Sequence, residues 1–292
     1  MTKITSICSG KGGVGKTTVA ANLAASLSEE KENKVLLADA NKISSHIEMI
    51  FNIKKSSEKI EGRAYRRLRK RLFYASSDEL EDEGIEKGDS VFHENLVDHG
   101  DFTHVIIDAP SGHGERARRC LRVSDLPVLL VEPSYSSIMD IARILETEDL
   151  KEYLIVANKV GDAEHEFNVK DVSKILQKTV DIKIPFNSGI ESSHSLSELM
   201  YHRIPVFEKK IDRIKEEIKD ADLRPRTNFS CMVCGESFRS ERGLHFHHME
   251  EHGDDEKLEY VCELCGYSFE NEEGLYEHVE ELHRGLKEEA DG

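Results

Sequence analysis

The sequence lacks any hydrophobic run of about 18 residues, the length a membrane-spanning helix needs, so we expect no such helix. Its first ten residues, MTKITSICSG, lack the apolar stretch of a secretory leader, and we therefore expect a cytoplasmic protein. A net positive charge is missing too. The formal charge of −17 argues against general attraction of the whole chain to nucleic acid.

Cysteine is scarce and unevenly placed. Four of the six cysteines form two C-x-x-C pairs after residue 230, whereas Cys8 and Cys120 stand alone and are expected in the core. Residues 227–292 hold 5 Lys and Arg against 18 Asp and Glu, a net charge of −13, which leaves only −4 for the rest. This break predicts two kinds of domain, and paired cysteines in a cytoplasmic chain favour metal binding over disulfides.

The first 205 residues alternate between short apolar runs and helical patterns. The expected strands are KITSIC, KVLLADA, THVIIDAP, LPVLLVEP and YLIVANKV. The expected helices are KTTVAANLAASLSEE and the ranges 115–122, 138–149 and 169–178. Nearly continuous apolar strands suit a parallel sheet covered on both faces, so the pattern predicts a doubly wound α/β domain.

A charged helix is predicted over residues 207–220, with Phe207, Ile211, Ile214 and Ile218 on one face. This face either packs on the domain's own sheet or forms a short coiled-coil contact with a second chain. The pattern favours the first. We expect domain boundaries at 1–222 for the α/β domain, a linker at 223–229, and two small domains at 230–253 and 260–284.

A glycine-rich loop, SGKGGVGKTT, lies between the first expected strand and helix. Residues Gly10 to Thr17 fit the phosphate-loop pattern G-x-x-x-x-G-K-[ST] in full. In such loops backbone N–H groups cradle phosphate oxygens, the second lysine reaches the β- and γ-phosphates, and the hydroxyl ligates Mg²⁺. The sequence therefore predicts ATP and Mg²⁺ bound by Gly12, Gly13, Val14, Gly15, Lys16, Thr17 and Thr18.

The string KGGVGKTT resembles the deviant phosphate loop of the MinD/ParA family of ATPases, relatives of nitrogenase iron protein. The resemblance spans about Lys3 to Phe207. It implies an ATP-dependent homodimer in which the early lysine, Lys11, crosses to the partner's ATP and acts there in catalysis. A lysine supplied in this way neutralises charge that develops on the transferred phosphoryl group.

Further segments match the family's landmarks. VIIDAPSG resembles its second switch, which implies that Asp108 holds the Mg²⁺ shell and that Gly112 follows the γ-phosphate. VANKV resembles the strand end whose asparagine reads adenine, here Asn158. The ordinary alternatives are a buried capping aspartate and a turn asparagine.

One landmark departs from the family pattern. After the second strand the family has D-x-D, whereas this chain has Asp39 followed by Asn41. The later carboxylate positions the attacking water in the family, and an amide cannot accept the proton of that water. The sequence therefore predicts firm ATP binding with slow hydrolysis, unless Asp39 takes over the role.

The acidic tail carries the ligand spacing of a zinc finger twice. In each copy two residues separate the cysteines, twelve precede the first histidine and four lie between the histidines. The resemblance to two-Cys-two-His fingers implies two Zn²⁺ ions, with His248 as an alternative to His247. The ligands are Cys231, Cys234, His247 and His252, then Cys262, Cys265, His278 and His283.

The partner of these fingers is expected to be a protein. The helix positions that usually read bases hold no arginine; they are Ser240, Gly243 and Phe246, then Asn271, Gly274 and Glu277. A tail with a net charge of −13 is also repelled by phosphate. DNA is the less favoured partner and would bind through the basic run at 63–71. We expect that run to form a solvated helix face, or to bind an acidic partner or the acidic tail.

Overall fold

The computed structural model describes residues 2–41, 46–53, 65–76, 102–148, 150–161, 167–190 and 199–221, together with the backbone of four short strands between residues 229 and 269. The described residues up to 221 belong to one compact unit and the four short strands to another.

The first unit is built on an eight-stranded sheet with the order β3-β4-β2-β5-β1-β6-β7-β8. All neighbouring pairs are parallel except β3 and β4, which pair antiparallel at one edge. The strands are β1 (Lys3–Cys8), β2 (Val35–Asp39), β3 (Arg66–Arg69), β4 (Leu72–Ala75), β5 (His104–Asp108), β6 (Val128–Val131), β7 (Leu154–Val160) and β8 (Ile182–Pro185).

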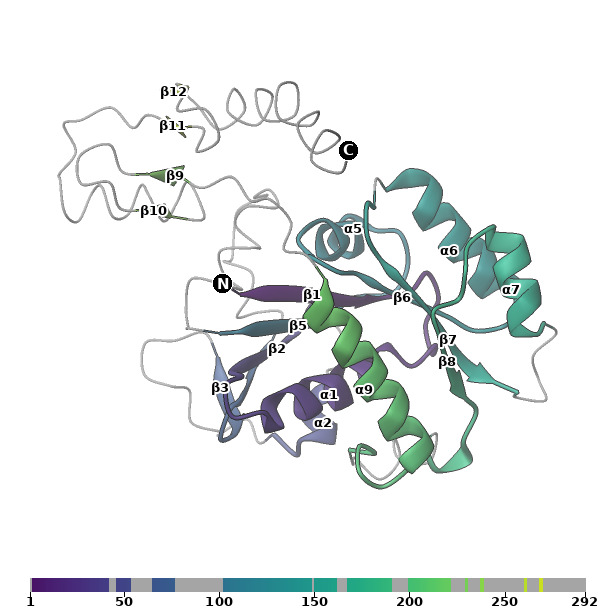
Figure 1. Cartoon of the computed structure of the whole chain (residues 1–292), viewed down its shortest axis with the longest axis horizontal. Helices are drawn as coiled ribbons and strands as arrows, with labels where there is room; N and C mark the ends of the chain where they lie inside the picture. Colours follow the sequence, from purple (N-terminus) through teal and green to yellow (C-terminus); the bar gives the residue numbers. More distant parts are fainter. Residues whose placement is uncertain are drawn as a thin grey trace. The chain divides into compact units, whose positions relative to one another are not determined.

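Helices cover both faces of the sheet, as Figure 1 shows, with α1 and α9 together on one face and α5, α6 and α7 on the other. The helices are α1 (Lys16–Glu29), α2 (His46–Ile50), α5 (Glu115–Arg122), α6 (Tyr135–Thr147), α7 (Val169–Leu176) and α9 (Pro205–Asp220). The predicted doubly wound α/β architecture is confirmed. None of the helices in the described ranges is long and apolar enough to span a bilayer.

Helix α1 lies deep in the domain because its side chains are small. Four alanines and Val19, Leu23 and Leu27 are at most 1% exposed, so the helix packs closely against the sheet. Its buried Asn22 accepts the backbone N–H groups of Met200 and Tyr201, both at 2.8 Å. The chain that leads into α9 is thereby fixed to the helix that follows the glycine-rich loop.

Helix α9 packs on its own domain, as the favoured alternative predicts. Its four apolar side chains, Phe207, Ile211, Ile214 and Ile218, are at most 1% exposed, so they are not free for a coiled-coil contact with a second chain. Lys3 Nζ donates to the carbonyl oxygens of Lys219 and Ala221, each at 2.7 Å, and so caps the last turn of this helix.

The basic run does not form the helix that we expected. Residues 66–69 form strand β3, and Tyr65, buried with Phe73 and Phe102 in an edge-to-face cluster, anchors it. Side chains along β3 alternate between half-buried and exposed, the period of a strand. Arg63 lies outside the described residues.

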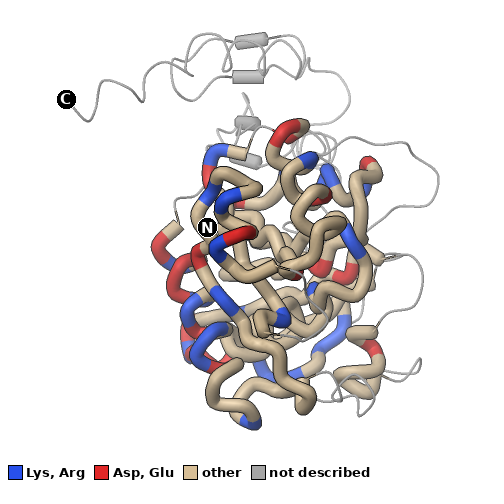
Figure 2. The backbone as a smooth tube through the Cα atoms, turned by 90° about the vertical axis from the view of Figure 1, so that its right-hand side faces the viewer, with Lys and Arg blue, Asp and Glu red and all other residues tan. Residues whose placement is uncertain are grey.

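Several of these basic side chains serve the domain itself. The Arg67 guanidinium lies 5.5 Å from the centre of the Phe73 ring. Arg71 donates to the carbonyl oxygens of Ser28 and Glu29, at 3.2 and 2.9 Å, at the end of α1. Basic and acidic stretches alternate along the side of the backbone shown in Figure 2. The contacts of Arg67 and Arg71 within the domain weaken the interpretation of the run as a nucleic-acid surface.

The second unit contains two antiparallel strand pairs. β9 (Phe229–Ser230) pairs with β10 (Ser237–Phe238), and β11 (Tyr260–Val261) pairs with β12 (Ser268–Phe269). All eight predicted zinc ligands and the predicted linker up to residue 228 lie outside the described residues. The domain boundaries drawn from the sequence therefore stay predictions.

Candidate functional site

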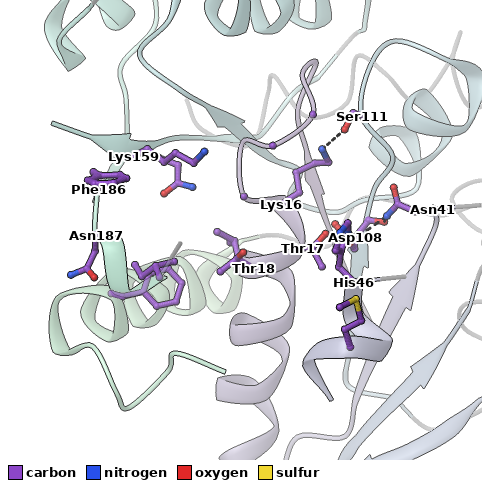
Figure 3. Close-up of a pocket in the computed structure, with 18 of the residues that line it drawn as sticks. Lys16, Thr17, Thr18, Asn41, His46, Asp108, Ser111, Lys159, Phe186 and Asn187 are labelled. Atoms are coloured by element: carbon purple, nitrogen blue, oxygen red, sulfur yellow. Dashed lines mark hydrogen bonds between the residues drawn. The ribbon is translucent and has the colours of Figure 1, made fainter. Parts of the chain in front are cut away.

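The glycine-rich loop lies at the centre of the sheet, where the carboxyl ends of β2, β5, β1, β6 and β7 meet. Open α/β sheets bind ligands at this edge, where neighbouring connections run to opposite sides. A cavity of about 680 Å³ opens here, a size that suits a small-molecule ligand. Figure 3 shows Lys16, Thr17 and Asp108 toward one end of it and Lys159, Phe186 and Asn187 toward the other.

Lys16, at the start of α1, is directed into the loop that precedes it. Its Nζ donates to Ser111 Oγ at 2.6 Å and to Ser9 Oγ at 3.0 Å, and lies 3.5 Å from the Lys11 carbonyl oxygen. Burial lowers the pKa of its ammonium, while the nearby Asp108 opposes that shift. A lysine held by weak neutral acceptors is poised to exchange them for an anion.

The next residue, Thr17, contacts a buried carboxylate. Its hydroxyl donates to Asp108 Oδ2 at 2.7 Å. Burial, and then the adjacent Asp39, raise the pKa of Asp108 to about 7. Its other oxygen, Oδ1, is buried without a hydrogen-bond partner among the described residues. A hydroxyl beside a buried carboxylate with an unused oxygen fits a hard divalent cation such as Mg²⁺.

Asp39 and Asp108 end neighbouring strands and lie opposite one another in the β2–β5 register. Both are 1% exposed. The amide nitrogen of Asn41 donates to Asp39 Oδ1 at 2.9 Å and lies 3.3 Å from Asp108 Oδ2. The Asn41 backbone N–H also donates to Asp39 Oδ1, at 3.0 Å. Asn41 thus bridges two carboxylates that would otherwise repel each other.

The loop needs glycine where it passes another strand. Gly15 has φ +99°, and a Cβ there would lie 2.5 Å from Asn158 Nδ2. Asn158, in β7, donates that amide to the Val14 carbonyl oxygen at 2.7 Å. Asn158 therefore fixes the loop from a position that lines the cavity. α1 starts without a side-chain cap, which leaves its first N–H groups for an anion.

The structure places the predicted residues in two groups. Gly12, Gly13, Gly15, Lys16, Thr17, Thr18, Asn41, Asp108 and Asn158 line the cavity together. The others lie beside it: Val14 is buried in the core and Asp39 lies beneath Asn41. Gly112 donates its N–H to the Ser9 carbonyl oxygen at 3.1 Å. Lys11 Nζ lies 3.8 Å from Glu132 Oε2.

Sequence reasoning missed several residues of this site. Ser111, within DAPSG, holds Lys16, and Glu132, at the end of the LPVLLVEP strand, lies beside Lys11. The far end of the cavity is lined by Lys159, Phe186 and Asn187. A strand-end position could have pointed to Glu132 and Lys159, whereas Phe186 and Asn187 lie in the segment IPFNSG, which resembles the family's closing segment, where a Pro-led loop passes near the base.

The zinc binding predicted for the tail has no counterpart among the described residues of the α/β unit. Within the described ranges no cluster of three or more His, Cys, Asp or Glu side chains forms a metal site. Cys8 and Cys120 are buried, as predicted, and burial raises the pKa of the Cys8 thiol to about 12, so it is inert.

Known proteins are similar to this chain in sequence and in fold. Residues 5–206 match the CobQ/CobB/MinD/ParA nucleotide-binding domain family. An uncharacterized ATP-binding protein of Methanocaldococcus jannaschii is 30% identical over 203 residues, which cover 65% of this chain and 77% of that protein. The septum site-determining protein MinD of Helicobacter pylori is 26% identical over 163 residues, covering 52% and 60% of the two chains.

Solved structures show the same fold. MinD of Pyrococcus horikoshii, complexed with Mg-ADP, has a TM-score of 0.61 at 21% identity and covers 75% of this chain and 97% of its own. The MinD of an Aquifex aeolicus MinC:MinD complex has a TM-score of 0.61 at 22% identity, covering 77% and 99%. The chain belongs to the CobQ/CobB/MinD/ParA family of P-loop nucleotide-binding proteins.

Proposed function

We propose that this protein is an ATP-dependent molecular switch, which binds Mg-ATP in the cavity, forms a homodimer in that state, hydrolyses ATP slowly and recruits a protein partner through two zinc fingers. The contact that carries the proposal is the Thr17 hydroxyl on Asp108, next to Lys16 in a complete phosphate loop. Family membership and the fold support ATP as the nucleotide.

Each loop residue has a role in this proposal. The backbone N–H groups of Gly12, Gly13, Val14 and Gly15, with the N-terminus of α1 at Lys16, Thr17 and Thr18, hold the phosphates. Lys16 exchanges Ser9 and Ser111 for phosphate oxygens. Thr17 and Asp108 would hold Mg²⁺, which supplies charge neutralisation at the phosphates.

Binding at the loop is coupled to the second switch. Ser111 leaves Lys16 when phosphate arrives, and the Gly112 N–H, now on the Ser9 carbonyl, turns to the γ-phosphate. At the other end Asn158 keeps its amide on Val14 and offers its side-chain oxygen to adenine. The 110–114 segment would thereby report whether the third phosphate is present.

Dimerisation rests on Lys11, which reaches the partner's ATP in this proposal. Two apolar side chains on α6 favour such a contact: Tyr135 is 60% and Met139 is 43% exposed, one helical turn apart. The same helix adjoins the glycine-rich loop, because a Cβ on Gly10 would lie 2.1 Å from Asp140 Cβ. Burying these side chains against a second copy would add apolar area around the nucleotide.

Recruitment of a partner is assigned to the tail. The β9–β10 pair brackets the first C-x-x-C pair and the β11–β12 pair brackets the second, the arrangement of a ββα zinc finger. The acidic charge of the tail favours a protein partner with a basic surface over DNA.

Calorimetric titration with Mg-ATP tests the nucleotide site. Lys16→Met keeps the length of the side chain and removes its charge, so we expect affinity to fall by about 10- to 100-fold. Lys31→Met, at an exposed position outside the cavity, is the matched control and should bind as the wild type does. Equal affinity of Lys16→Met and wild type would remove the proposed site.

A further inference from the structure

Glu132 places a buried carboxylate between two lysines. It follows β6 directly, and its backbone N–H donates to Ser137 Oγ at 3.0 Å, which fixes the turn into α6. Its side chain is 7% exposed. One carboxylate oxygen lies 2.8 Å from Lys159 Nζ, and the other lies 3.8 Å from Lys11 Nζ. A carboxylate this buried is stabilised by the cations beside it.

The two lysines differ in how firmly they are held. Lys159 lines the cavity near the end of β7. Its φ of +55° is a restricted backbone conformation, and its side chain is 30% exposed. Lys11 lies in the loop, is 45% exposed and contacts Glu132 at the longer distance. Because Lys159 keeps Glu132 paired, Lys11 can leave without stranding a buried charge. Lys11 is therefore the releasable partner.

We propose that Glu132 is a positioning residue that holds Lys11 against its own subunit, and that Lys11 exchanges Glu132 for the nucleotide phosphates of a second copy when the dimer forms. The inference rests on the proposed function, in which Lys11 acts across the dimer. Glu132 then competes with the partner's nucleotide for the same ammonium group. This competition raises the protein concentration that ATP-driven dimerisation requires.

The first test measures the dimer dissociation constant in Mg-ATP by sedimentation equilibrium. Glu132→Gln keeps the shape of the side chain and removes its charge, so we expect dimerisation to tighten by about twofold to thirtyfold, because each of the two subunits releases one weak ion pair. Glu148→Gln is the matched control. Glu148 is also little exposed, pairs with Arg118 at 3.3 Å, and should leave dimerisation unchanged.

Repeating Glu132→Gln in a Lys11→Ala background shows through which of the two lysines Glu132 acts on dimerisation. If Glu132 acts by holding Lys11, the substitution has no effect on dimerisation once Lys11 is gone. An undiminished effect in that background would mean that Glu132 acts through Lys159, and would overturn the proposal.

The second test needs neither ATP nor a dimer. In the nucleotide-free monomer, an amine-reactive reagent should label Lys11 faster in Glu132→Gln than in wild type, with labelling read by peptide mass spectrometry. The labelling rate of Lys11 in wild type should also rise with salt, because salt screens the pair between Lys11 and Glu132. This measurement tests the proposal even if the variant misfolds. Unchanged rates in both would overturn the proposal. A wild type that labels as expected yet never dimerises with ATP would instead contradict the proposed function.

Discussion

The side-chain amide of Asn41 donates to Asp39 Oδ1 at 2.9 Å and ties the end of β2 to the loop that follows it. The same nitrogen lies 3.3 Å from Asp108 Oδ2. An aspartate at position 41 would instead place a third carboxylate beside two that are already buried. The amide therefore stabilises this edge of the sheet when no metal is bound, and the nitrogen it uses for this is not available to hold the attacking water.

Asn41→Asp should make the protein depend on metal for stability. In EDTA we expect the free energy of unfolding to fall by about 1–3 kcal/mol, because two hydrogen bonds are replaced by repulsion between carboxylates. Mg²⁺ should restore most of that loss. Urea unfolding with EDTA and with Mg²⁺ measures both.

Asn52→Asp provides the control for this substitution, because it makes the same chemical change at an exposed position with φ +50°. It should alter stability little in either buffer. An Asn41→Asp loss of equal size with and without Mg²⁺ would contradict the bridging role assigned to Asn41.

The rate of ATP hydrolysis should rise with the same substitution, although stability in EDTA falls. With Mg²⁺ present, Asn41→Asp should speed single-turnover hydrolysis by about tenfold or more, the range usual for a positioned base, and change ATP affinity little. Rapid-quench measurement distinguishes this from the alternative in which Asp39 orients the water. In that case Asn41→Asp is neutral and Asp39→Asn abolishes turnover while Mg-ATP still binds.

His104 should make the domain sensitive to acid. Burial, followed by the charge of Lys3, lowers the pKa of this histidine from 6.5 to about 4. The folded state therefore favours the neutral ring, and the stability this contributes is present above pH 6.5 and is lost as the pH falls toward 4. The loss is at most about 3 kcal/mol. His104→Gln, which cannot titrate, should show a correspondingly flatter stability profile in urea unfolding between pH 7 and 4.

His202 supplies a control of opposite sign. Its contacts with Glu208 and Glu29 raise the pKa of the ring, so its contribution is present at low pH and is lost as the pH rises through that raised value. Comparing the stability of His202→Gln with that of His104→Gln over the same pH range separates the contributions of the two histidines. A profile of His104→Gln parallel to that of wild type would refute the assignment to His104.

Zinc should fold the tail alone. Two four-ligand sets predict about two zinc ions per chain, and a domain of this size depends on its metal to fold. A zinc-selective chelator should unfold residues 227–292 and leave Mg-ATP affinity unchanged. Elemental analysis, with proteolysis before and after chelation, checks this. Protein purified without chelators yet free of zinc would exclude the finger assignment.

Much of the α/β domain could be predicted from the sequence. Five central strands are apolar over most of their length and stand between helical patterns, and each forms where expected, with β1 at the predicted residues Lys3–Cys8. The phosphate-loop spacing is local, so it also located Lys16 and Thr17. Asp108 was implied by the resemblance of VIIDAPSG to the family's second switch.

The edge strands were missed for a physical reason. β3 reads as a basic run because its exposed side faces water, and only its pairing with β4 and the packing of Tyr65 make it a strand. β4 and β8 are four residues each, too short to show a period of their own. The contact of Asn41 with Asp108 and those of Glu132 with Lys11 and Lys159 join segments that are distant in sequence, which no local pattern encodes.

Sedimentation velocity of the nucleotide-free, ADP and ATP states, with Mg²⁺ throughout, tests the central claim most directly. We expect wild type to be monomeric without nucleotide and with ADP, and dimeric with ATP. Lys11→Ala should still bind ATP through Lys16 yet remain monomeric, whereas Lys31→Met should behave as wild type. A dimer that forms equally well without ATP, or that persists in Lys11→Ala, would contradict the switch proposed for this protein.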